Sequence, residues 1–398
     1  MRDHGGWRKA AAGAGLLAAD GSMAETIFAE MTALAARTGA INLGQGFPDE
    51  DGPAHVLEAA RAAIAAGTNQ YPPGRGILEL RSAVSEHQKR FYGLEVDPES
   101  EVLATAGATE ALAATILALV ELGDEVLTFE PYYDAYGALI SLAGGVHTTV
   151  PLSWPHFEPD LDQLARAVTD KTRLIIVNDP HNPTGTVFSA ETRELIVQLA
   201  EKHGAIIVTD EVYEHLTFGE RHTPIATVPG AGSRTVTISS GGKTFNTTGW
   251  KIGWLTASAD LVDAILTVKQ YLSYSNGAPF QPAIAAGLRS DDRFFEELAT
   301  NLDRKRLLLN HGLRSAGFDI AESAGTYFTV ADAAALGFDD AVEFCRILPE
   351  RAGVIAVPIS AFVTRKHAPK YRSLVRFAFC KRTETLEQAI TQLARLRR

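Results

Sequence analysis

The chain has 398 residues, of which 46% are hydrophobic, and its formal net charge at pH 7 is −11. This acidic balance argues against nucleic acid as a partner, because binding to the phosphate backbone needs a basic surface. No apolar run reaches the roughly 20 residues of a membrane-spanning helix. The two cysteines, Cys345 and Cys380, suit buried thiols in a reducing cytoplasm rather than a disulfide framework or a zinc site. We therefore expect a cytoplasmic protein without a metal, long enough for more than one domain.

The N-terminal part of the chain contains one clear helix. Residues 1–22 resemble a targeting segment only faintly, because they lack a long apolar stretch and a cleavage site, and we expect a frayed N-terminal extension there. Apolar residues recur at helical spacing from Glu25 to Arg37. The next stretch contains Gly44 and Gly46 and is too rich in glycine for regular structure. It is either a plain connector or a backbone that lies against a small ligand.

Short β-rich runs alternate with helical runs after residue 101, which predicts a mainly parallel sheet covered by helices. The predicted strands are 102–105, 125–129, 173–178, 205–209 and 235–239, and the predicted helices are 55–66, 77–92, 111–122 and 190–202. A charged helix and two short strands follow at 291–313, 325–329 and 374–379. We expect a large domain at 48–285 and a smaller α+β domain that combines 23–47 with 286–398.

Polar or aromatic groups follow the carboxyl ends of four predicted strands, where parallel sheets bind their ligands. They are Tyr133, Asn182, Asp210, Tyr213, Ser240 and Lys243. A single polar residue after a strand is usually part of an ordinary turn. Four strand ends that converge on a lysine indicate a ligand-binding site. The neighbouring Glu211, His181 and His215 are interpreted as solvated or locally hydrogen-bonded groups.

The turn that ends in Ala108 and Thr109 leads from a predicted strand into a helix. Backbone N–H groups at such a helix start have no partner within the helix and suit an anion. An ordinary strand–helix connection is the commoner meaning of this motif taken alone.

Lys243 follows two serines and two glycines at the end of a strand. A ligand can approach such a backbone closely, and an amine becomes nucleophilic when burial or a neighbouring cation lowers its pKa. Lys251, eight positions further on, is a candidate both for lowering the pKa of Lys243 and for holding a phosphate. A lysine in a loop of this kind is usually a solvated residue, so the catalytic interpretation depends on the converging strand ends.

These residues resemble a known family. The stretches 182–185 and 210–213, Lys243 with Lys251, and Arg376 occur in the order and rough spacing of the fold-type I, class I/II aminotransferases, which use pyridoxal 5′-phosphate. Within that family, the stretches 240–245 and 248–254 resemble the kynurenine/glutamine aminotransferase branch. The stretches 42–53, 269–282 and 374–382 are similar to actinobacterial N-succinyldiaminopimelate aminotransferases.

The resemblance implies a fold and an activity. The fold would be a mainly parallel seven-stranded sheet flanked by helices, with a smaller α+β domain. The activity would be ping-pong transfer of an amino group between an amino acid and a 2-oxo acid, with glutamate and 2-oxoglutarate as one pair and N-succinyl-L,L-diaminopimelate as the donor. The alternative is a kynurenine, glutamine, methionine or aromatic transaminase with cysteine-conjugate β-lyase side activity. A non-enzymatic regulatory domain is disfavoured because the lysine, aspartate, asparagine and arginine are all present.

The resemblance also implies roles around the cofactor ring. Lys243 would form a Schiff base with the cofactor and then act as a general acid and base. Asp210 would face the pyridine nitrogen, and a carboxylate there keeps the ring protonated. Asn182 and Tyr213 would hydrogen-bond the phenolic oxygen, and Tyr133 would stack on the ring.

The phosphate would be held by Ala108, Thr109, Ser240 and Lys251, with Tyr71 reaching across from a second subunit. The last role implies a homodimer. Aspartate-type aminotransferases carry arginine at the position of Lys251, which places this chain outside that subgroup, although lysine is an adequate point charge for phosphate.

The substrate would be held by a second group of residues. Arg376 would bind the α-carboxylate in a bidentate fork, a geometry that lysine cannot supply. The expected substrate-binding residues are Arg376, Asn182, Gly46 and Phe28, with Tyr132 and Tyr274 shaping the side-chain pocket. No second arginine for a distal carboxylate is evident from the sequence.

Overall fold

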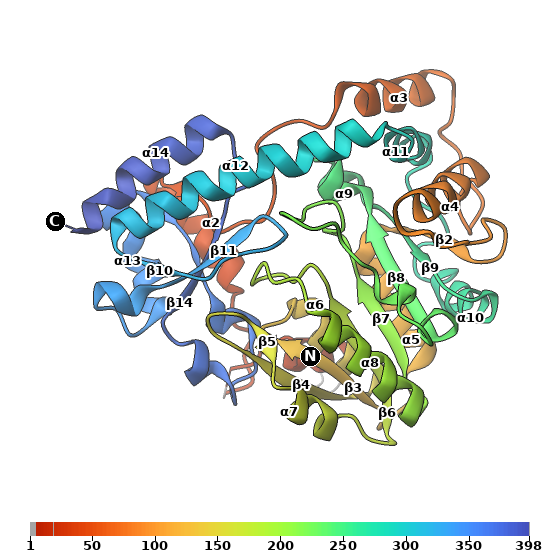
Figure 1. Ribbon diagram of the computed structural model, residues 1–398, viewed down its shortest axis with the longest axis horizontal. Helices are drawn as coiled ribbons and strands as arrows, with labels where there is room; N and C mark the ends of the chain where they lie inside the picture. Colours follow the sequence, from red (N-terminus) through yellow and green to blue (C-terminus); the bar gives the residue numbers. More distant parts are fainter. Residues whose placement is uncertain (1–4, 19, 398) are drawn as a thin grey trace.

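The computed structural model describes residues 5–18 and 20–397. Residues 1–4 and 19 of the predicted N-terminal extension lie outside this description. An eight-stranded sheet forms the centre of the larger part of the molecule (Figure 1). In spatial order its strands are β2 (Val102–Ala106), β9 (Ile252–Thr256), β8 (Thr235–Ser240), β7 (Ile206–Asp210), β6 (Thr172–Asn178), β3 (Glu125–Glu130), β4 (Val146–Ser153) and β5 (Glu158–Pro159).

Neighbouring strands of this sheet pair in parallel, except that β9 runs antiparallel to β2 and β8, and β5 runs antiparallel to β4. The predicted mainly parallel sheet is therefore confirmed. Its seven expected strands are extended by β5, a two-residue strand at one edge.

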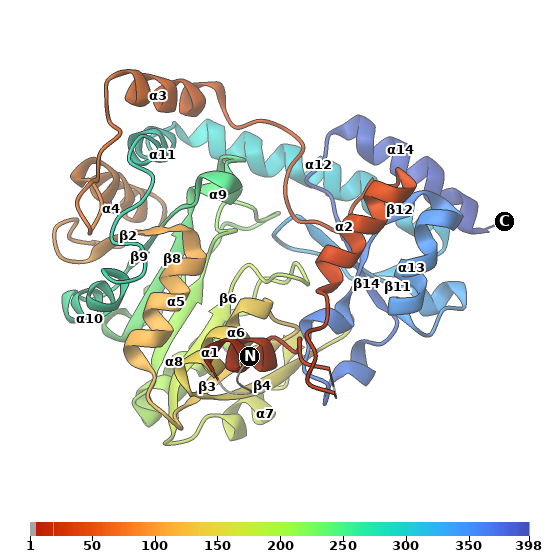
Figure 2. The same cartoon turned by 180° about the vertical axis from the view of Figure 1, so that it is seen from behind.

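Helices cover both faces of the sheet (Figures 1 and 2). One face carries α5 (Gly107–Leu119), α6 (Asp134–Ala143) and α10 (Ala259–Lys269), and the other carries α7 (Leu161–Ala167) and α8 (Ala190–His203). Because strands covered on both faces bury all their side chains, their sequences are nearly continuous apolar runs, as the sequence of β7 is. A third group packs on β2 and β9: α3 (Ala54–Ala65), α4 (Leu78–Tyr92) and α11 (Phe280–Leu288).

The N-terminal extension is not frayed where it is described. Residues 6–13 form helix α1 (Gly6–Gly13), which lies against α6 (Figure 2). The two helices touch through glycines, since a Cβ atom at Gly13 would lie 2.1 Å from the carbonyl oxygen of Gly137. Our expectation was wrong because the partner of α1 lies more than a hundred residues away in the sequence.

The smaller part of the molecule is built on a four-stranded antiparallel sheet. Its order is β10 (Asp319–Ile320), β11 (Phe328–Asp332), β14 (Leu374–Ala378) and β13 (Val357–Pro358). The helices around it are α2 (Ile27–Thr38), α12 (Asp292–Ala316), α13 (Ala341–Ala352) and α14 (Thr383–Leu393). Met31 of α2 shares this core with Leu348 and Phe377, and β1 (Ile41–Asn42) pairs with β12 (Val354–Ile355). Among the described residues, no helix is long and apolar enough to cross a membrane.

Candidate active site

A cavity of about 230 Å³ opens at the carboxyl ends of β6, β7 and β8. It is lined by every predicted cofactor-binding residue except Tyr71, namely Ala108, Thr109, Tyr133, Asn182, Asp210, Tyr213, Ser240, Lys243 and Lys251. Asn178 and Thr248 also line it, and neither is among the predicted site residues. The structure therefore gathers five separate segments of the chain around one lysine.

Lys243 lies in the short helix α9 (Gly241–Thr244), directly after β8. Its Nζ atom donates a hydrogen bond of 3.4 Å to the carbonyl oxygen of Gly46 and lies 5.7 Å from the ring centre of Tyr213 and 5.5 Å from that of Tyr327. Burial lowers the pKa of Lys243 to about 8. Lys251 acts in the same direction, but its effect on this pKa is smaller than that of burial.

Asp210 ends β7 and has one free carboxylate oxygen. Its Oδ2 atom accepts a hydrogen bond of 2.6 Å from the hydroxyl of Tyr136, while Oδ1 is buried and has no hydrogen-bond partner among the described residues. Burial raises the pKa of Asp210. A buried carboxylate oxygen without a partner is costly, and an N–H donor in the cavity would satisfy it. The protonated pyridine nitrogen of pyridoxal phosphate supplies such a donor, so the site fits this cofactor at its ring end.

The start of α5 and Lys251 form an anion cradle at the other end of the cavity. Gly107 has a φ of +73°, and the N-cap residue Ala106 has no side chain that could bond the N–H groups of the first turn, although its own N–H donates to Glu110. A Cβ atom at Gly107 would lie 3.1 Å from Cε of Lys251, whose Nζ donates a hydrogen bond of 3.3 Å to Oγ1 of Thr109. Helix N–H groups, a hydroxyl and an ammonium together suit a phosphate group.

Arg376 reaches the site from β14 of the smaller sheet. Its Nη1 donates to Oδ1 of Asn182 at 3.0 Å and its Nη2 to the carbonyl of Gly44 at 2.7 Å, while Nε is buried without a partner among the described residues. The guanidinium lies 4.0 Å from the ring centre of Phe328 and 5.7 Å from that of Phe28. Burial lowers its pKa to about 10, so it stays charged at neutral pH.

Asn178 connects the segments that carry Asn182 and Asp210 through two hydrogen bonds. Its Oδ1 accepts from the backbone N–H of Asn182 at 2.7 Å, and its Nδ2 donates to the carbonyl of Asp210 at 2.8 Å. Its position at the end of β6 was a usable signal, because we had already singled out polar groups at strand ends.

Tyr327 was also missed. Its hydroxyl donates a hydrogen bond of 2.5 Å to the carbonyl of Gly46, the same oxygen that accepts from Lys243. Gly46 has no space for a side chain, since a Cβ atom would lie 2.5 Å from Cζ of Phe328. No local sequence signal identifies this contact, because it joins residues 281 positions apart.

Tyr71 and Tyr274 lie away from the cavity. Their rings meet edge to face at 5.8 Å, and 84% of Tyr71 is exposed. Neither lines the cofactor cavity of its own chain.

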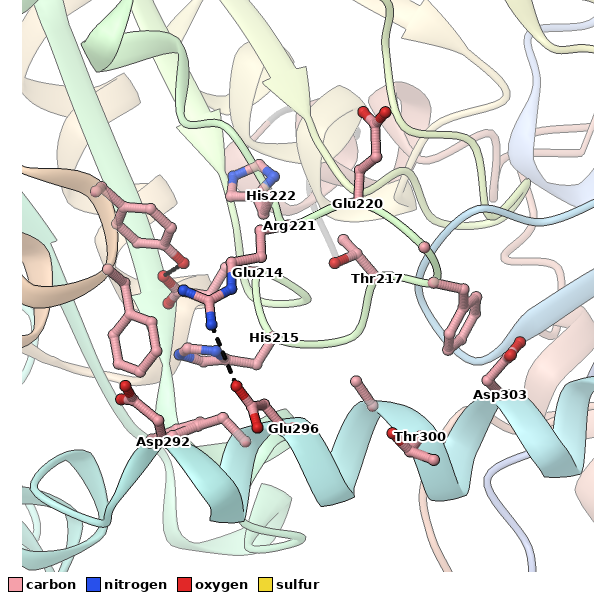
Figure 3. A pocket seen from close by; sticks show the side chains of 16 residues that line it. Glu214, His215, Thr217, Glu220, Arg221, His222, Asp292, Glu296, Thr300 and Asp303 are labelled. Atoms are coloured by element: carbon pink, nitrogen blue, oxygen red, sulfur yellow. Dashed lines mark hydrogen bonds and ion pairs between the residues drawn. The ribbon is translucent and has the colours of Figure 1, made fainter.

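A separate cavity of about 320 Å³ lies between α12 and the segment 214–222 (Figure 3). His87, Glu214 and His215 are grouped there closely enough to hold a metal ion. The two histidines hydrogen-bond each other at 2.6 Å, and the Glu214 oxygens accept from Tyr92 and Ser239. These groups are thus hydrogen-bonded locally.

The two other polar groups interpreted as local are bonded in the same way. Glu211 pairs with His222 at 2.9 Å, and His181 bonds Thr184 at 2.7 Å. All of them lie outside the cofactor cavity.

A buried lysine, a carboxylate with an unsatisfied oxygen and an anion cradle at the edge of this sheet define a pyridoxal-phosphate enzyme of fold type I. The chain belongs to the family "Aminotransferase class I and II", which it matches over residues 38–393. It is an aminotransferase that depends on pyridoxal phosphate.

The chain is 51% identical over 380 residues to the probable N-succinyldiaminopimelate aminotransferase of Mycobacterium tuberculosis, covering 93% of this chain and 96% of that protein. It is 40% identical over 372 residues to the methionine aminotransferase of Escherichia coli, with the same shares covered. The solved structure of the Mycobacterium tuberculosis N-succinyldiaminopimelate aminotransferase superposes with a TM-score of 0.91 at 52% identity, covering 94% of this chain and 97% of that one. The resemblance inferred from the sequence is confirmed.

Proposed function

We propose that this aminotransferase takes its amino group from N-succinyl-L,L-diaminopimelate and passes it to 2-oxoglutarate in a ping-pong cycle, as a step of lysine biosynthesis in the cytoplasm. The observation that carries this proposal is 51% identity, over nearly the full length of both chains, to a protein named for that donor. The methionine aminotransferase relative supports the alternative, a broad methionine, kynurenine or glutamine transaminase with β-lyase side activity.

We propose the following roles for the cofactor site. Lys243 would hold the cofactor covalently through its amine, and the free Oδ1 of Asp210 would accept a hydrogen bond from the protonated ring nitrogen. Tyr133 stacks on the ring, while Asn182 and Tyr213 hydrogen-bond its phenolic oxygen. The phosphate lies in the cradle of Ala108, Thr109, Ser240 and Lys251.

When bound, the cofactor withdraws electrons from the α-carbon of the substrate and so makes its C–H bond acidic. Lys243, once its amine is free, would take the α-proton on Nζ and deliver it to the cofactor carbon on the other side of the transferred nitrogen. A pKa of about 8 suits both steps, since the neutral and protonated amines are both populated near neutral pH. The carbonyl of Gly46 accepts a hydrogen bond from this Nζ and so limits where the amine points.

Arg376 positions the substrate for this proton transfer. Its buried guanidinium is held by Asn182 and Gly44, and its planar fork can bind both oxygens of an α-carboxylate. The aromatic ring of Phe328 above it keeps water away and fixes its plane. The substrate is held at its amine by the cofactor and at its carboxylate by Arg376, and these two contacts orient its α-hydrogen toward Lys243.

We also propose a homodimer. Large apolar side chains are exposed around Tyr71, including Tyr271 (85% exposed), Leu272 and Tyr274. A second copy of the chain that covers this patch would bring the hydroxyl of Tyr71 to the phosphate cradle of its partner, which explains why Tyr71 does not reach the cradle of its own chain.

The half-reaction tests the donor. Enzyme loaded with pyridoxal phosphate is mixed separately with N-succinyl-L,L-diaminopimelate, kynurenine, glutamine, methionine and glutamate, and the visible absorbance of the cofactor is followed by rapid mixing. We expect the succinylated donor to react fastest. A succinylated donor that is inert beside a fast methionine or kynurenine reaction would replace the proposal by its alternative, and pyruvate release without an oxo acid would reveal the β-lyase.

A further inference from the structure

A cavity of about 610 Å³ lies beside the active site, on the far side of Phe28. One wall is formed by residues 12–17 at the end of α1 and by the start of α2, and the opposite wall by the segment Ser360–Arg365. It is much larger than the 230 Å³ cofactor cavity. The predicted substrate residue Phe28 thus has a second compartment behind it, walled in part by the N-terminal extension.

Only one aromatic layer separates this compartment from Arg376. The guanidinium lies 5.7 Å from the ring centre of Phe28 and 4.7 Å from that of Phe362, and these two rings meet edge to face at 5.5 Å. The turn before α6 borders both cavities, since Tyr133 lines the cofactor cavity while Tyr132 and Asp134 line the second one. The compartment therefore lies directly behind the aromatic rings that pack on Arg376.

Arg365 supplies a cation to the compartment. Its Nη2 donates a hydrogen bond of 2.9 Å to the carbonyl of Leu17, and it has no ion pair with any described residue. A guanidinium has five N–H donors, so several remain for a ligand.

The start of α2 adds a second favourable element for an anion. Thr26 caps the helix by accepting from the N–H of Ala29 at 3.1 Å, but the N–H groups of Ile27 and Phe28 have no acceptor among the described residues. At the facing end of α1, the carbonyls of Ala10 and Ala11 accept hydrogen bonds from Ala14 and Leu16.

Two carboxylates, Glu25 and Asp134, also line the compartment. Burial raises the pKa of Asp134, while Arg376 opposes that rise. Carboxylates and hydroxyls such as that of Ser360 accept N–H donors. The lining therefore combines a cation for a carboxylate and acceptors for an N–H group with a largely aliphatic wall that suits the methylene groups of a long chain.

We infer that this compartment is a subsite for the far end of a long donor that carries a carboxylate and an amide N–H beyond its reacting carbon, and that Arg365 binds that carboxylate. The inference rests on the proposed function and deepens it, because N-succinyl-L,L-diaminopimelate has such a far end. Methionine is too short and too apolar to use Arg365.

The test compares half-reactions of the full-length enzyme carrying its cofactor. The proteins are the wild type, Arg365→Ala, Arg365→Lys and the matched control Lys366→Ala, whose side chain is exposed on the same segment but does not line the compartment. The donors are N-succinyl-L,L-diaminopimelate and methionine. Each reaction yields a maximal rate and a half-saturating concentration.

We expect Arg365→Ala to raise the half-saturating concentration of the succinylated donor by about fivefold, the upper end for a charge pair at an exposed side chain. Arg365→Lys should recover part of this loss. Methionine should react with all four proteins within about twofold of each other, which also shows that the variants are folded and loaded.

The inference is overturned if the wild type uses the succinylated donor well and Arg365→Ala uses it equally well, or if Arg365→Ala slows both donors alike. A wild type that does not use the succinylated donor at all overturns the proposed function first, and the subsite with it. The two failures can be told apart, because failure of the proposed function is already seen with the wild-type enzyme, whereas failure of the subsite is seen only with Arg365→Ala.

Discussion

Tyr136 donates its hydroxyl hydrogen to one carboxylate oxygen of Asp210 and leaves the other oxygen buried without a partner in the cofactor cavity. The contact fixes the plane of the carboxylate and aims the free oxygen. Asp210→Asn keeps the shape of the side chain but removes the negative charge that we propose holds the ring proton. We expect the half-reaction to slow by roughly a hundredfold or more, measured by rapid mixing. Tyr136→Phe is the control and should lose much less, since the carboxylate remains; equal losses would show that orientation matters more than charge.

The lysine pKa predicts how the protein takes up its cofactor. Without the cofactor, Lys243 has a pKa lowered to about 8, so its neutral, nucleophilic form gains population as the pH rises through 8 rather than through 10.5. The rate of cofactor capture by the cofactor-free protein should therefore rise with pH, with a midpoint near 8. Because burial dominates the shift, Lys251→Ala should move the midpoint only slightly, although it weakens phosphate binding. A midpoint close to 10 in the wild type would contradict this view of the pocket.

The same shift affects stability. The folded pKa of Lys243 lies below its ordinary value of 10.5, so the unfolded chain binds more protons between pH 8 and 10.5. This group therefore makes the cofactor-free protein more stable as the pH rises through that window. Lys243→Met removes the protonated amine from the cavity, and we expect it to unfold at higher urea than the wild type at pH 7, with the difference shrinking toward pH 10. An unchanged difference across the window would exclude Lys243 as its source.

Arg376→Lys keeps the charge but loses the planar fork. We expect the catalytic efficiency to fall about tenfold to hundredfold for every amino acid donor, because all share the α-carboxylate. Steady-state kinetics with two unrelated donors measures this effect. Arg372→Lys, an exposed pair partner of Asp340, is the matched control and should change nothing. A loss confined to one donor would place Arg376 at the side chain instead.

Gly46→Ala would drive a methyl group into Phe328, 2.5 Å away, and move the carbonyl that Lys243 and Tyr327 share. We expect a loss of about 1–3 kcal/mol in the free energy of unfolding, typical of overpacking, together with slower proton transfer. Gly232→Ala, at an exposed position with open space around it, should leave both unchanged. Denaturant titration and the half-reaction measure the two effects, and an unaffected Gly46→Ala enzyme would show that the loop relaxes freely.

The proposed dimer predicts complementation between two defective chains. Tyr71→Ala removes the proposed phosphate contact, and Lys243→Ala removes the reactive amine. In a mixed dimer, one site combines the intact Lys243 of one chain with the intact Tyr71 of the other. Coexpression of the two variants should restore roughly a quarter of wild-type activity, more than either variant alone. No gain in a preparation shown to contain mixed dimers would place Tyr71 outside the site.

The sequence was sufficient to predict the site residues whose positions follow from the ends of strands. Asp210 ends a strand, and Lys243 and Asn182 stand a few residues after one, so the parallel sheet alone brings them to one edge. Arg376 could be assigned only through the family resemblance, because its burial among aromatic rings joins two parts of the chain. Tyr327 and Tyr136 could not be found, since each acts through one contact with a residue far away in the sequence. The same reason explains why α1 was expected to be frayed.

The glycine contact between α1 and α6 makes the very beginning of the described chain part of a wall near the substrate. Helix α1 leaves no space at Gly13 or Gly137, so a shift of one helix moves the other. Helix α6 begins at Asp134, directly after the cofactor-lining Tyr133. A bulkier side chain at Gly13 or Gly137 should thus push the two helices apart and move the wall that the end of α1 contributes to the second compartment.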